Sequence, residues 1–352
     1  MTELERAVAL LKAGELVAFP TETVYGLGAD AANPEGVRKI FAAKGRPADH
    51  PVIVHLARGE DMTAWAADIP PLAWRLSEIF WPGPLTLILK KQPWVSSLVT
   101  GGQESVGLRV PAHPLAQALL TAFAAVSPGI GRGGIAAPSA NRFGRVSPTT
   151  AAHVREELGD RLACILDGGP AQVGIESTIL DLTRLADEGP VILRPGGIPA
   201  ERLCQLFRSF APGEPRKPFP AASAAPAVSP TPRVSGSLAS HYAPATSLHL
   251  CPGAELSARL ARESAAGRRC GVMAWNAKGN AEVGGAHLWR ILPASPEGYA
   301  HDLYATLREL DAARCDAIIA ELPPDTPEWQ AIHDRLRRAS HETHPEKISP
   351  RS

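Results

Sequence analysis

The chain has 352 residues, 45% of them hydrophobic, which is enough for two domains with a buried core in each. Lysine and arginine total 36 and balance 36 aspartate and glutamate residues, which excludes a strong overall field that would draw the protein to nucleic acid or a membrane. The five cysteines lack CxxC spacing, which disfavours a structural metal site or disulfide framework and fits a reducing compartment.

The N-terminus carries no sign of a targeting segment. It begins Met1-Thr2-Glu3 and lacks the apolar core of a signal peptide. No segment has the uninterrupted apolar length that a membrane-spanning helix needs. We therefore expect a cytoplasmic protein with no membrane partner.

The first 205 residues alternate between apolar runs typical of strands and segments with helical periodicity. Helices are predicted over 2–13, from Asn33-Pro34 to Lys44, near 70–80 and 114–125, and from a cap at Ser147-Pro148 to about Leu158. Strands are predicted over 16–19, 52–56, 85–89, 106–110, 162–166, 178–182 and 190–194. This alternation predicts an α/β domain with a mixed sheet.

The composition changes abruptly between Ala211 and Pro232, where seven prolines lie among alanine and serine. Such a stretch cannot bury a core, and it predicts an extended, semi-stiff linker between two bodies. Beyond it, strands are predicted over 247–251, 270–274, 288–292 and 317–322, and helices near 254–265, 297–312 and 327–339. These elements predict a second, smaller βαβ-type domain of about 100 residues.

Four polar strings follow apolar, strand-like runs, where an α/β sheet places its binding loops. They are Pro20–Gly28, Lys44–Pro47, Ser139–Asn141 and Glu176–Thr178. Together they supply hydroxyls, fixed cations and glycine backbone, which suit a cleft that holds several anions. They contain no clear pair of nucleophile and base. The combination predicts nucleotide chemistry driven by positioning.

The first string carries two threonines and two glycines. Thr21 and Thr23 alternate along the chain, so their hydroxyls are expected on one side, where they bind a substrate or else cap their own turn. Gly26-x-Gly28 matches a dinucleotide fingerprint only formally, because the next helix opens several residues later. We expect these glycines to let the backbone approach a ligand or turn tightly.

The cations and Ser147 each allow two interpretations. Lys44 and Arg46 end a predicted helix, where they complement its dipole or bind an anion at the mouth of the sheet. Arg109 lies on an apolar strand and needs a partner or a cavity. Ser147 either caps its helix alone or marks a helix N-terminus that binds phosphate.

In this order, the strings resemble the threonylcarbamoyladenylate synthases, the YrdC/Sua5 family that acts in tRNA modification. The resemblance covers residues 1 to about 205, except for the glycine-rich 129–134, where the family usually has an apolar strand. It resumes at 240–244, Ser-His-Tyr-Ala-Pro, which is similar to the segment leading into the extra C-terminal domain of Sua5-type members.

The resemblance implies three regions. Residues 1–208 would form a YrdC-like catalytic domain, a twisted mixed sheet with flanking helices. Residues 209–244 would form a Pro/Ala-rich linker and lid, and residues 245–345 a Rossmann-like C-terminal domain whose role stays open.

The resemblance also implies the reaction, which condenses L-threonine, bicarbonate and ATP to threonylcarbamoyl-AMP and pyrophosphate for the t6A modification of tRNA. A downstream threonylcarbamoyl-transferase complex would take the product, and direct tRNA binding is not required. ATP enters as a substrate, Mg²⁺ is expected with it, and no tightly bound prosthetic group is expected. Asp167 and Glu176 are candidates for holding the ion, without a firm metal assignment.

The resemblance assigns roles residue by residue. Lys44 and Arg46 become the catalytic cations. L-Threonine and bicarbonate would contact Thr21, Thr23, Tyr25, His50, His113 and Ser177, although His113 is equally well explained as a helix-start residue. ATP would contact Arg109, Ser139, Asn141, Ser147, Arg194, His241 and Tyr242. His241 and Tyr242 would belong to a lid that folds back over the nucleotide and excludes water.

Two alternatives remain beside this hypothesis. The same fold has been associated with double-stranded RNA, but the balanced charge offers no extended basic stripe for strong RNA binding. Hydrogenase-maturation carbamoyltransferases share the carbamoyl-adenylating chemistry, but they carry zinc-finger-like and kinase-like regions that this sequence lacks.

Overall fold

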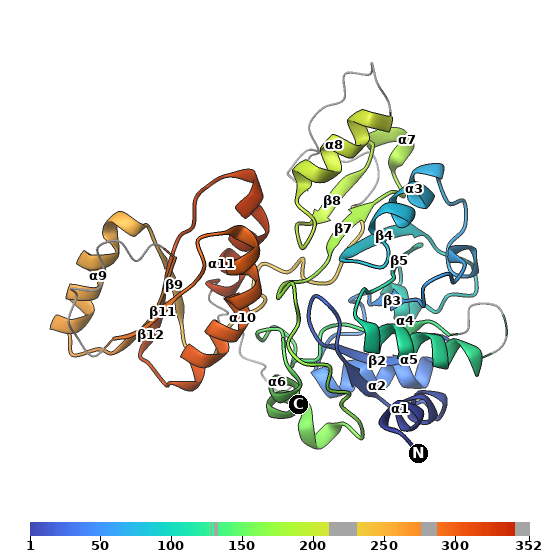
Figure 1. Ribbon diagram of the computed structural model, residues 1–352, viewed down its shortest axis with the longest axis horizontal. Helices are drawn as coiled ribbons and strands as arrows, with labels where there is room; N and C mark the ends of the chain where they lie inside the picture. Colours follow the sequence, from blue (N-terminus) through green and yellow to red (C-terminus); the bar gives the residue numbers. More distant parts are fainter. Residues whose placement is uncertain (128, 130–132, 211–230, 276–286, 342–352) are drawn as a thin grey trace, which may run out of the picture.

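The computed structural model describes residues 1–127, 129, 133–210, 231–275 and 287–341, and most of the predicted linker lies outside them. The described chain forms two sheets, each with its own helices, that lie side by side (Figure 1). The first belongs to an N-terminal domain and the second to a C-terminal domain, which confirms the predicted α/β class. In the described ranges, no helix combines the length and the apolar character needed to cross a membrane.

The N-terminal sheet has eight strands in the order β1-β2-β6-β3-β5-β4-β7-β8. It is mixed, because β3 runs parallel to β5 and β4 parallel to β7, while the other neighbours are antiparallel. The strands are β1 (Val17–Phe19), β2 (Gly26–Asp30), β3 (Ile53–His55), β4 (Leu85–Lys90), β5 (Ser105–Arg109), β6 (Ile135–Ala136), β7 (Thr178–Asp181) and β8 (Val191–Arg194).

Helices flank this sheet, and their ends follow the capping signals of the sequence. The α-helices are α1 (Glu3–Lys12), α2 (Pro34–Lys44), α3 (Pro71–Phe80), α4 (Ser97–Thr100), α5 (Pro114–Ala125), α6 (Ala151–Leu158), α7 (Leu185–Glu188) and α8 (Ala200–Phe210), with 3-10 turns at Met62–Ala64 and Gly159–Arg161. Asn33 caps α2 by accepting from two backbone N–H groups, and Gly45 ends it in a left-handed conformation. The helix thereby ends at Lys44.

Three expectations about strands need correction. β2 and β6 were not expected as strands, yet they lie between β1 and β3 in the sheet. Glycine weakens the strand signal of β2, but an ideal Cβ at Gly28 would lie 2.8 Å from the ring of Phe19, so here glycine permits close packing rather than a turn. Residues 162–166 form only an isolated bridge at Ile165, because pairing with β1 is limited to Ala18.

The expected helix cap at Ser147 is also wrong. Helix α6 begins at Ala151, and its cap is Thr150, whose side chain accepts from the backbone N–H of His153. Ser147 instead donates its hydroxyl to Glu176 Oε1 over 2.6 Å. The polar run up to Thr150 contains several residues able to cap, so the sequence alone did not separate them.

The C-terminal domain is a four-stranded parallel sheet in the order β11-β10-β12-β9. Its strands are β9 (Leu248–Cys251), β10 (Cys270–Ala274), β11 (Leu288–Ile291) and β12 (Ala317–Glu321), and its helices are α9 (Gly253–Ala265), α10 (Pro296–Ala312) and α11 (Gln330–Ala339), the last preceded by a 3-10 turn at Pro327–Trp329. These elements match the predicted ones closely. Helices α10 and α11 lie on the side of this sheet that faces the N-terminal domain, and α9 lies on the other side (Figure 1).

The two domains share part of a hydrophobic core. Val24, Val146 and Ile175 of the N-terminal domain belong to the same buried cluster as Leu303 and Leu307 of α10. Continuity of apolar packing across the boundary favours a fixed arrangement of the domains.

A buried carboxylate lies at this boundary. Glu176 is 6% exposed and accepts from Ser147, from the Tyr304 hydroxyl over 2.9 Å and from Arg335 Nε over 2.8 Å. Burial alone would raise its pKa, but the positive charges of Arg335 and Arg194 and the hydrogen bonds outweigh burial and lower the pKa of Glu176 to about 2. The carboxylate therefore stays ionised and ties the two domains together.

Replacing Glu176 by glutamine should destabilise the protein by about 3 kcal/mol at neutral pH, from the difference between its pKa in the folded chain and the ordinary value of 4.5. Because the folded-state pKa is depressed, this stabilisation is complete above about pH 4.5 and is lost as the pH falls toward 2. Denaturant unfolding of wild type and Glu176→Gln between pH 7 and pH 3 measures the difference.

Glu104→Gln is the matched control, since the ion pair of Glu104 with Lys91 is 3.6 Å long and its carboxylate side chain is exposed. If the free energy of unfolding of wild type exceeded that of Glu176→Gln by the same amount from pH 7 to pH 3, an ionised Glu176 stabilised by its ion pair would be contradicted.

Candidate active site

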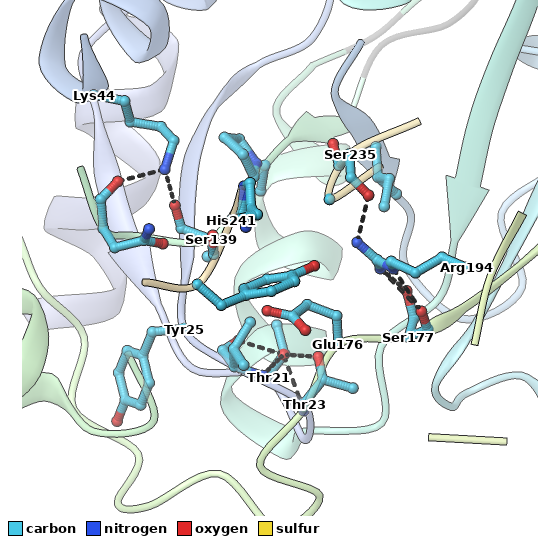
Figure 2. A pocket seen from close by; sticks show the side chains of 18 of the residues that line it. Thr21, Thr23, Tyr25, Lys44, Ser139, Glu176, Ser177, Arg194, Ser235 and His241 are labelled. Carbon is cyan, nitrogen blue, oxygen red and sulfur yellow. Dashed lines mark hydrogen bonds between the residues drawn. The ribbon is translucent and has the colours of Figure 1, made fainter. Parts of the chain in front are cut away.

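One pocket of the N-terminal domain gathers most of the predicted site residues (Figure 2). Those that line it are Thr21, Thr23, Tyr25, Lys44, Arg46, Arg109, Ser139, Asn141, Ser177, Arg194, His241 and Tyr242. They come from the ends of α2, β1, β5 and β8 and from the loops before α6 and β7. The remaining ones come from the segment 233–243, which we call the lid. The pocket is narrow, with a cavity volume of about 50 Å³.

Three buried cations face this pocket, and among the described residues their hydrogen-bond partners are all neutral groups. Lys44 Nζ donates to the carbonyls of Ser139, over 2.6 Å, and Asn141. Arg46 donates to the Pro51 carbonyl over 2.7 Å and to the Ser235 hydroxyl.

Arg194, the third cation, donates to the carbonyl of Ser177 over 2.9 Å and to that of Ser235 over 2.8 Å. Within the described ranges, none of the three cations forms an ion pair with a carboxylate. Buried charges are normally paired, so the pocket is suited to an anionic ligand.

Burial and neighbouring positive charge lower the pKa values of the cations in this pocket. Burial, and then the charge of Arg46, hold the pKa of Lys44 well below its ordinary value. Burial also lowers the pKa of Arg46 to about 10, with a contribution from Arg194. A bound anion would oppose both effects, because it favours the charged form of each cation.

Hydroxyl groups lie beside these cations. The Thr21 and Thr23 hydroxyl oxygens are 2.8 Å apart, as expected from their alternation. Thr21 also accepts from the backbone N–H of Thr23 and donates to the carbonyl of Val24, so the capping interpretation holds for it. The Ser177 hydroxyl lies 2.8 Å from that of Thr86. Thr23 and Ser177 therefore present polar groups to the cavity.

Arg109 lines the pocket, but its charge is already balanced. Its Nη2 lies 2.6 Å from Glu22 Oε1, and both side chains are about 5% exposed. The other oxygen of Glu22 accepts from the backbone N–H of Ala112. Arg109 therefore has the charged partner expected for an arginine on an apolar strand. The sequence alone did not identify Glu22 as that partner.

The lid occupies one side of the pocket. Ser235, Gly236, His241 and Tyr242 all line the cavity, although the first two were not predicted, because they follow a proline-rich stretch without a site signal. Burial lowers the pKa of His241 to about 3, so its ring is neutral at physiological pH. Tyr242 is 1% exposed and has a left-handed backbone with φ of 62°.

Several buried polar atoms around the cavity have no hydrogen-bond partner among the described residues. They are Arg46 Nε, Asn141 Oδ1, His241 Nδ1 and the Tyr242 hydroxyl. Buried polar groups are rarely left unpaired in folded proteins, so each such group calls for an explanation. Their concentration around one cavity indicates a site that a polar ligand completes.

Four of the predicted site residues make other contacts in the structure, and for His113 these agree with the helix-start alternative. His113 caps α5 by accepting from the Leu115 N–H, and it lies outside the pocket lining. His50 packs edge-on against Phe143 with ring centroids 5.4 Å apart, also outside the lining. Ser147 binds Glu176, as described above.

Tyr25 lines the pocket, but its hydroxyl donates to the Gly169 carbonyl over 2.7 Å, and Figure 2 shows the ring turned away from the centre. A sequence pattern places such residues near a site without fixing the direction of their side chains.

Two models of protein families match the chain. One, described as "Telomere recombination", matches residues 9–196, and the other, described as the C-terminal domain of threonylcarbamoyl-AMP synthase, matches residues 198–341.

Similar proteins span nearly the whole chain. A threonylcarbamoyl-AMP synthase of Bacillus subtilis is 43% identical over 96% of this chain and 93% of its own length. One of Pyrococcus abyssi is 38% identical over 95% of this chain and 93% of its own length.

The fold agrees with a solved structure. The crystal structure of P. abyssi Sua5 complexed with L-threonine superposes with a TM-score of 0.80 at 36% identity, covering 97% of this chain and 95% of that one. Fold, domain order and nearly full-length identity therefore agree, and the chain belongs to the Sua5-type threonylcarbamoyl-AMP synthases, enzymes that serve the t6A modification of tRNA.

Proposed function

We propose that the pocket beneath the lid is where this chain condenses L-threonine, bicarbonate and ATP to threonylcarbamoyl-AMP and pyrophosphate. The observation that carries the proposal is the set of Lys44, Arg46 and Arg194, three buried cations without a carboxylate partner among the described residues, gathered around one cavity. The charge lies inside the pocket rather than along a surface stripe, which supports small anionic substrates over an RNA-binding module.

The threonine end of the site is assigned to the hydroxyl-bearing wall. Thr23 and Ser177 present hydroxyls to the cavity, which suit the carboxylate and hydroxyl of L-threonine. The P. abyssi protein of similar structure was crystallised with L-threonine, which supports the same ligand here. The bicarbonate-derived oxygens would then lie toward Lys44 and Arg46.

The nucleotide end is assigned to Ser139, Asn141, Arg194 and the lid. The free Oδ1 of Asn141 is able to accept a hydrogen bond from a nucleotide, and the free Nδ1 of the neutral His241 is able to accept or donate one, depending on its tautomer. Arg194 carries the charge suited to phosphate. Arg109 is assigned an indirect part, since its charge is balanced by Glu22, whose neighbours Thr21 and Thr23 line the pocket.

The proposed chemistry needs no nucleophile from the protein. The threonine amine adds to the bicarbonate carbon, and a carbon–oxygen bond breaks so that water leaves with a proton of the amine and a carbamate remains. A carbamate oxygen then attacks the α-phosphorus of ATP, and the bond from that phosphorus to the bridging oxygen breaks to release pyrophosphate. The reactants carry negative charge throughout, which the cations neutralise. Positioning and electrostatic stabilisation of this kind supply much of the barrier reduction in such reactions.

Mg²⁺ is proposed to arrive with ATP rather than through a protein site. The two candidate acids do not fit an ion-binding role, because both Glu176 oxygens already accept from Ser147, Tyr304 and Arg335. Asp167 lies near Arg155 and binds the backbone N–H of Gly169. Within the described residues, no group of three acidic, histidine or cysteine side chains gathers to hold a metal.

The lid is proposed to open for ATP and to close over the adenylate. A cavity of about 50 Å³ is far smaller than sites for drug-sized ligands, which are roughly 300 Å³ or more. The lid segment is fastened by Arg233, which donates to the Gly101 carbonyl, and by Ala243, whose N–H donates to Gly144. Closure would protect the labile product from water until the transferase complex receives it in the cytoplasm.

Replacing Lys44 or Arg46 by alanine should lower threonine-dependent pyrophosphate release about 10- to 100-fold, since each charged contact to an oxyanion contributes roughly 1.5–3 kcal/mol. The measurement is pyrophosphate release by purified protein with ATP and bicarbonate, with and without L-threonine, and with serine as a substrate control. Lys90→Ala is the matched variant, because Lys90 is an exposed lysine paired with Asp68. Full activity in both Lys44→Ala and Arg46→Ala would exclude this pocket as the reaction site.

Replacing Gly236 by alanine should keep the lid from closing. Gly236 has φ of 80°, and a Cβ there would overlap the hydroxyl of Tyr242. We expect a rise of about tenfold in the KM for ATP. Gly189→Ala controls for backbone strain alone, because Gly189 has φ of 75° with open space around its Cβ position. Equal KM values in the two variants would show that lid packing at Gly236 is irrelevant to ATP binding.

A further inference from the structure

Arg335 on α11 connects the C-terminal domain to two loops of the N-terminal domain. It is 1% exposed, donates from Nε to Glu176 over 2.8 Å and from Nη1 to the Pro195 carbonyl over 2.9 Å. Glu176 directly precedes Ser177, and Pro195 directly follows Arg194. One guanidinium therefore braces both loops that carry pocket residues, although it does not line the pocket itself.

The same guanidinium also faces the lid. Its Cζ lies 5.1 Å from the centre of the Tyr242 ring, within the range of a cation–π interaction. Tyr304 of α10 stacks on Tyr242 as well, with ring centroids 5.7 Å apart, and its hydroxyl donates to Glu176. Arg335 and Tyr304 thus each contact both the lid tyrosine and the carboxylate at the domain boundary.

The backbone of the lid is fastened to α11 too. The N–H of His241 donates to the Arg338 carbonyl over 3.2 Å, and the Arg338 guanidinium donates back to the carbonyl of Leu238. Movement of the lid away from the pocket would break these contacts or carry α11 along. Closure of the lid and docking of the C-terminal domain are therefore linked through the same helix.

Resting on the proposed function, we propose that Arg335 is a positioning residue that holds the lid closed. It fixes Tyr242 against Glu176 and Pro195, and so couples docking of the C-terminal domain to ATP binding and to retention of threonylcarbamoyl-AMP. This gives the C-terminal domain, which contributes no residue to the pocket lining within the described ranges, a defined part in the reaction cycle.

The test compares full-length Arg335→Met, Arg335→Lys and Tyr304→Phe with the control Arg308→Met. Arg308 also lies on the domain boundary, where it binds the Val146 carbonyl and lies 3.1 Å from Glu157, but no hydrogen bond or ion pair joins it to the lid among the described residues. Two quantities are measured for each variant: kcat and KM for ATP in threonine-dependent pyrophosphate release, and the amount of radiolabelled threonine that stays with the protein as adenylate after rapid gel filtration.

For Arg335→Met we expect a KM for ATP about tenfold higher, with kcat changed less than about threefold, because the lost contact acts on binding rather than on the chemical step. We also expect about tenfold less retained adenylate. In Arg335→Lys, we expect the KM for ATP and the retained adenylate to lie between those of Arg335→Met and wild type, since lysine keeps the charge beside Glu176. In Tyr304→Phe, we expect both quantities to change in the same direction as in Arg335→Met, but less. Arg308→Met stays near wild type in KM and retention, even where its thermal stability falls.

The proposal is overturned if Arg335→Met equals Arg308→Met in KM and in retention. Should Arg335→Met fail to fold, wild-type values in both Arg335→Lys and Tyr304→Phe overturn it. A wild-type protein that releases no pyrophosphate in response to L-threonine overturns the proposed function and this inference together. If wild type is active and the Arg335 variants keep its KM for ATP and its adenylate retention, this inference alone is overturned.

Discussion

The buried carboxylate of Glu176 is the interaction on which the rest of the structure depends. It accepts from Ser147 within its own domain and from Tyr304 and Arg335 across the boundary. Without this carboxylate, Asp334 would be the one acidic partner of the buried Arg335 among the described residues. The surface of α11 that meets the lid would also lose its ion pair with the N-terminal domain. Glu176 thus contacts the second domain directly and, through Arg335 and Tyr304, the lid tyrosine, and it lies in the loop before β7 itself.

The buried positive charges of the pocket destabilise the folded protein. Burial lowers the pKa values of Lys44, Arg46 and Arg194, and a neighbouring cation adds to this for each of them: Arg46 for Lys44, Arg194 for Arg46 and Arg335 for Arg194. Carbonyl groups only partly compensate for their lost hydration. This arrangement lowers the stability of the empty protein, and anionic substrates bound as proposed would relieve it. Substrate binding and folding are therefore thermodynamically linked, so ligands that bind the native state stabilise it.

Sequence reasoning predicted most of the fold, because its signals were local. Capping residues such as Asn33 and the apolar runs of the C-terminal domain gave element bounds within a few residues. The failures have tertiary causes. β2 is glycine-rich because Phe19 packs across it, and Ser147 turns to Glu176 rather than to a helix. Motif strings located the pocket, but the Glu22 and Arg335 pairings depend on residues brought together only by folding, which no local pattern encodes.

The left-handed backbone of Tyr242, with φ of 62°, has a consequence for turnover. For a residue with a bulky side chain this conformation costs roughly 1–2 kcal/mol, and here the contacts of Tyr242 with Arg335 and Tyr304 oppose that cost. If the lid opens as proposed, this backbone strain at Tyr242 would be released, which would offset part of the cost of opening. A product that passes intact to another catalyst, as proposed, would then leave more readily than from a fully relaxed closed form.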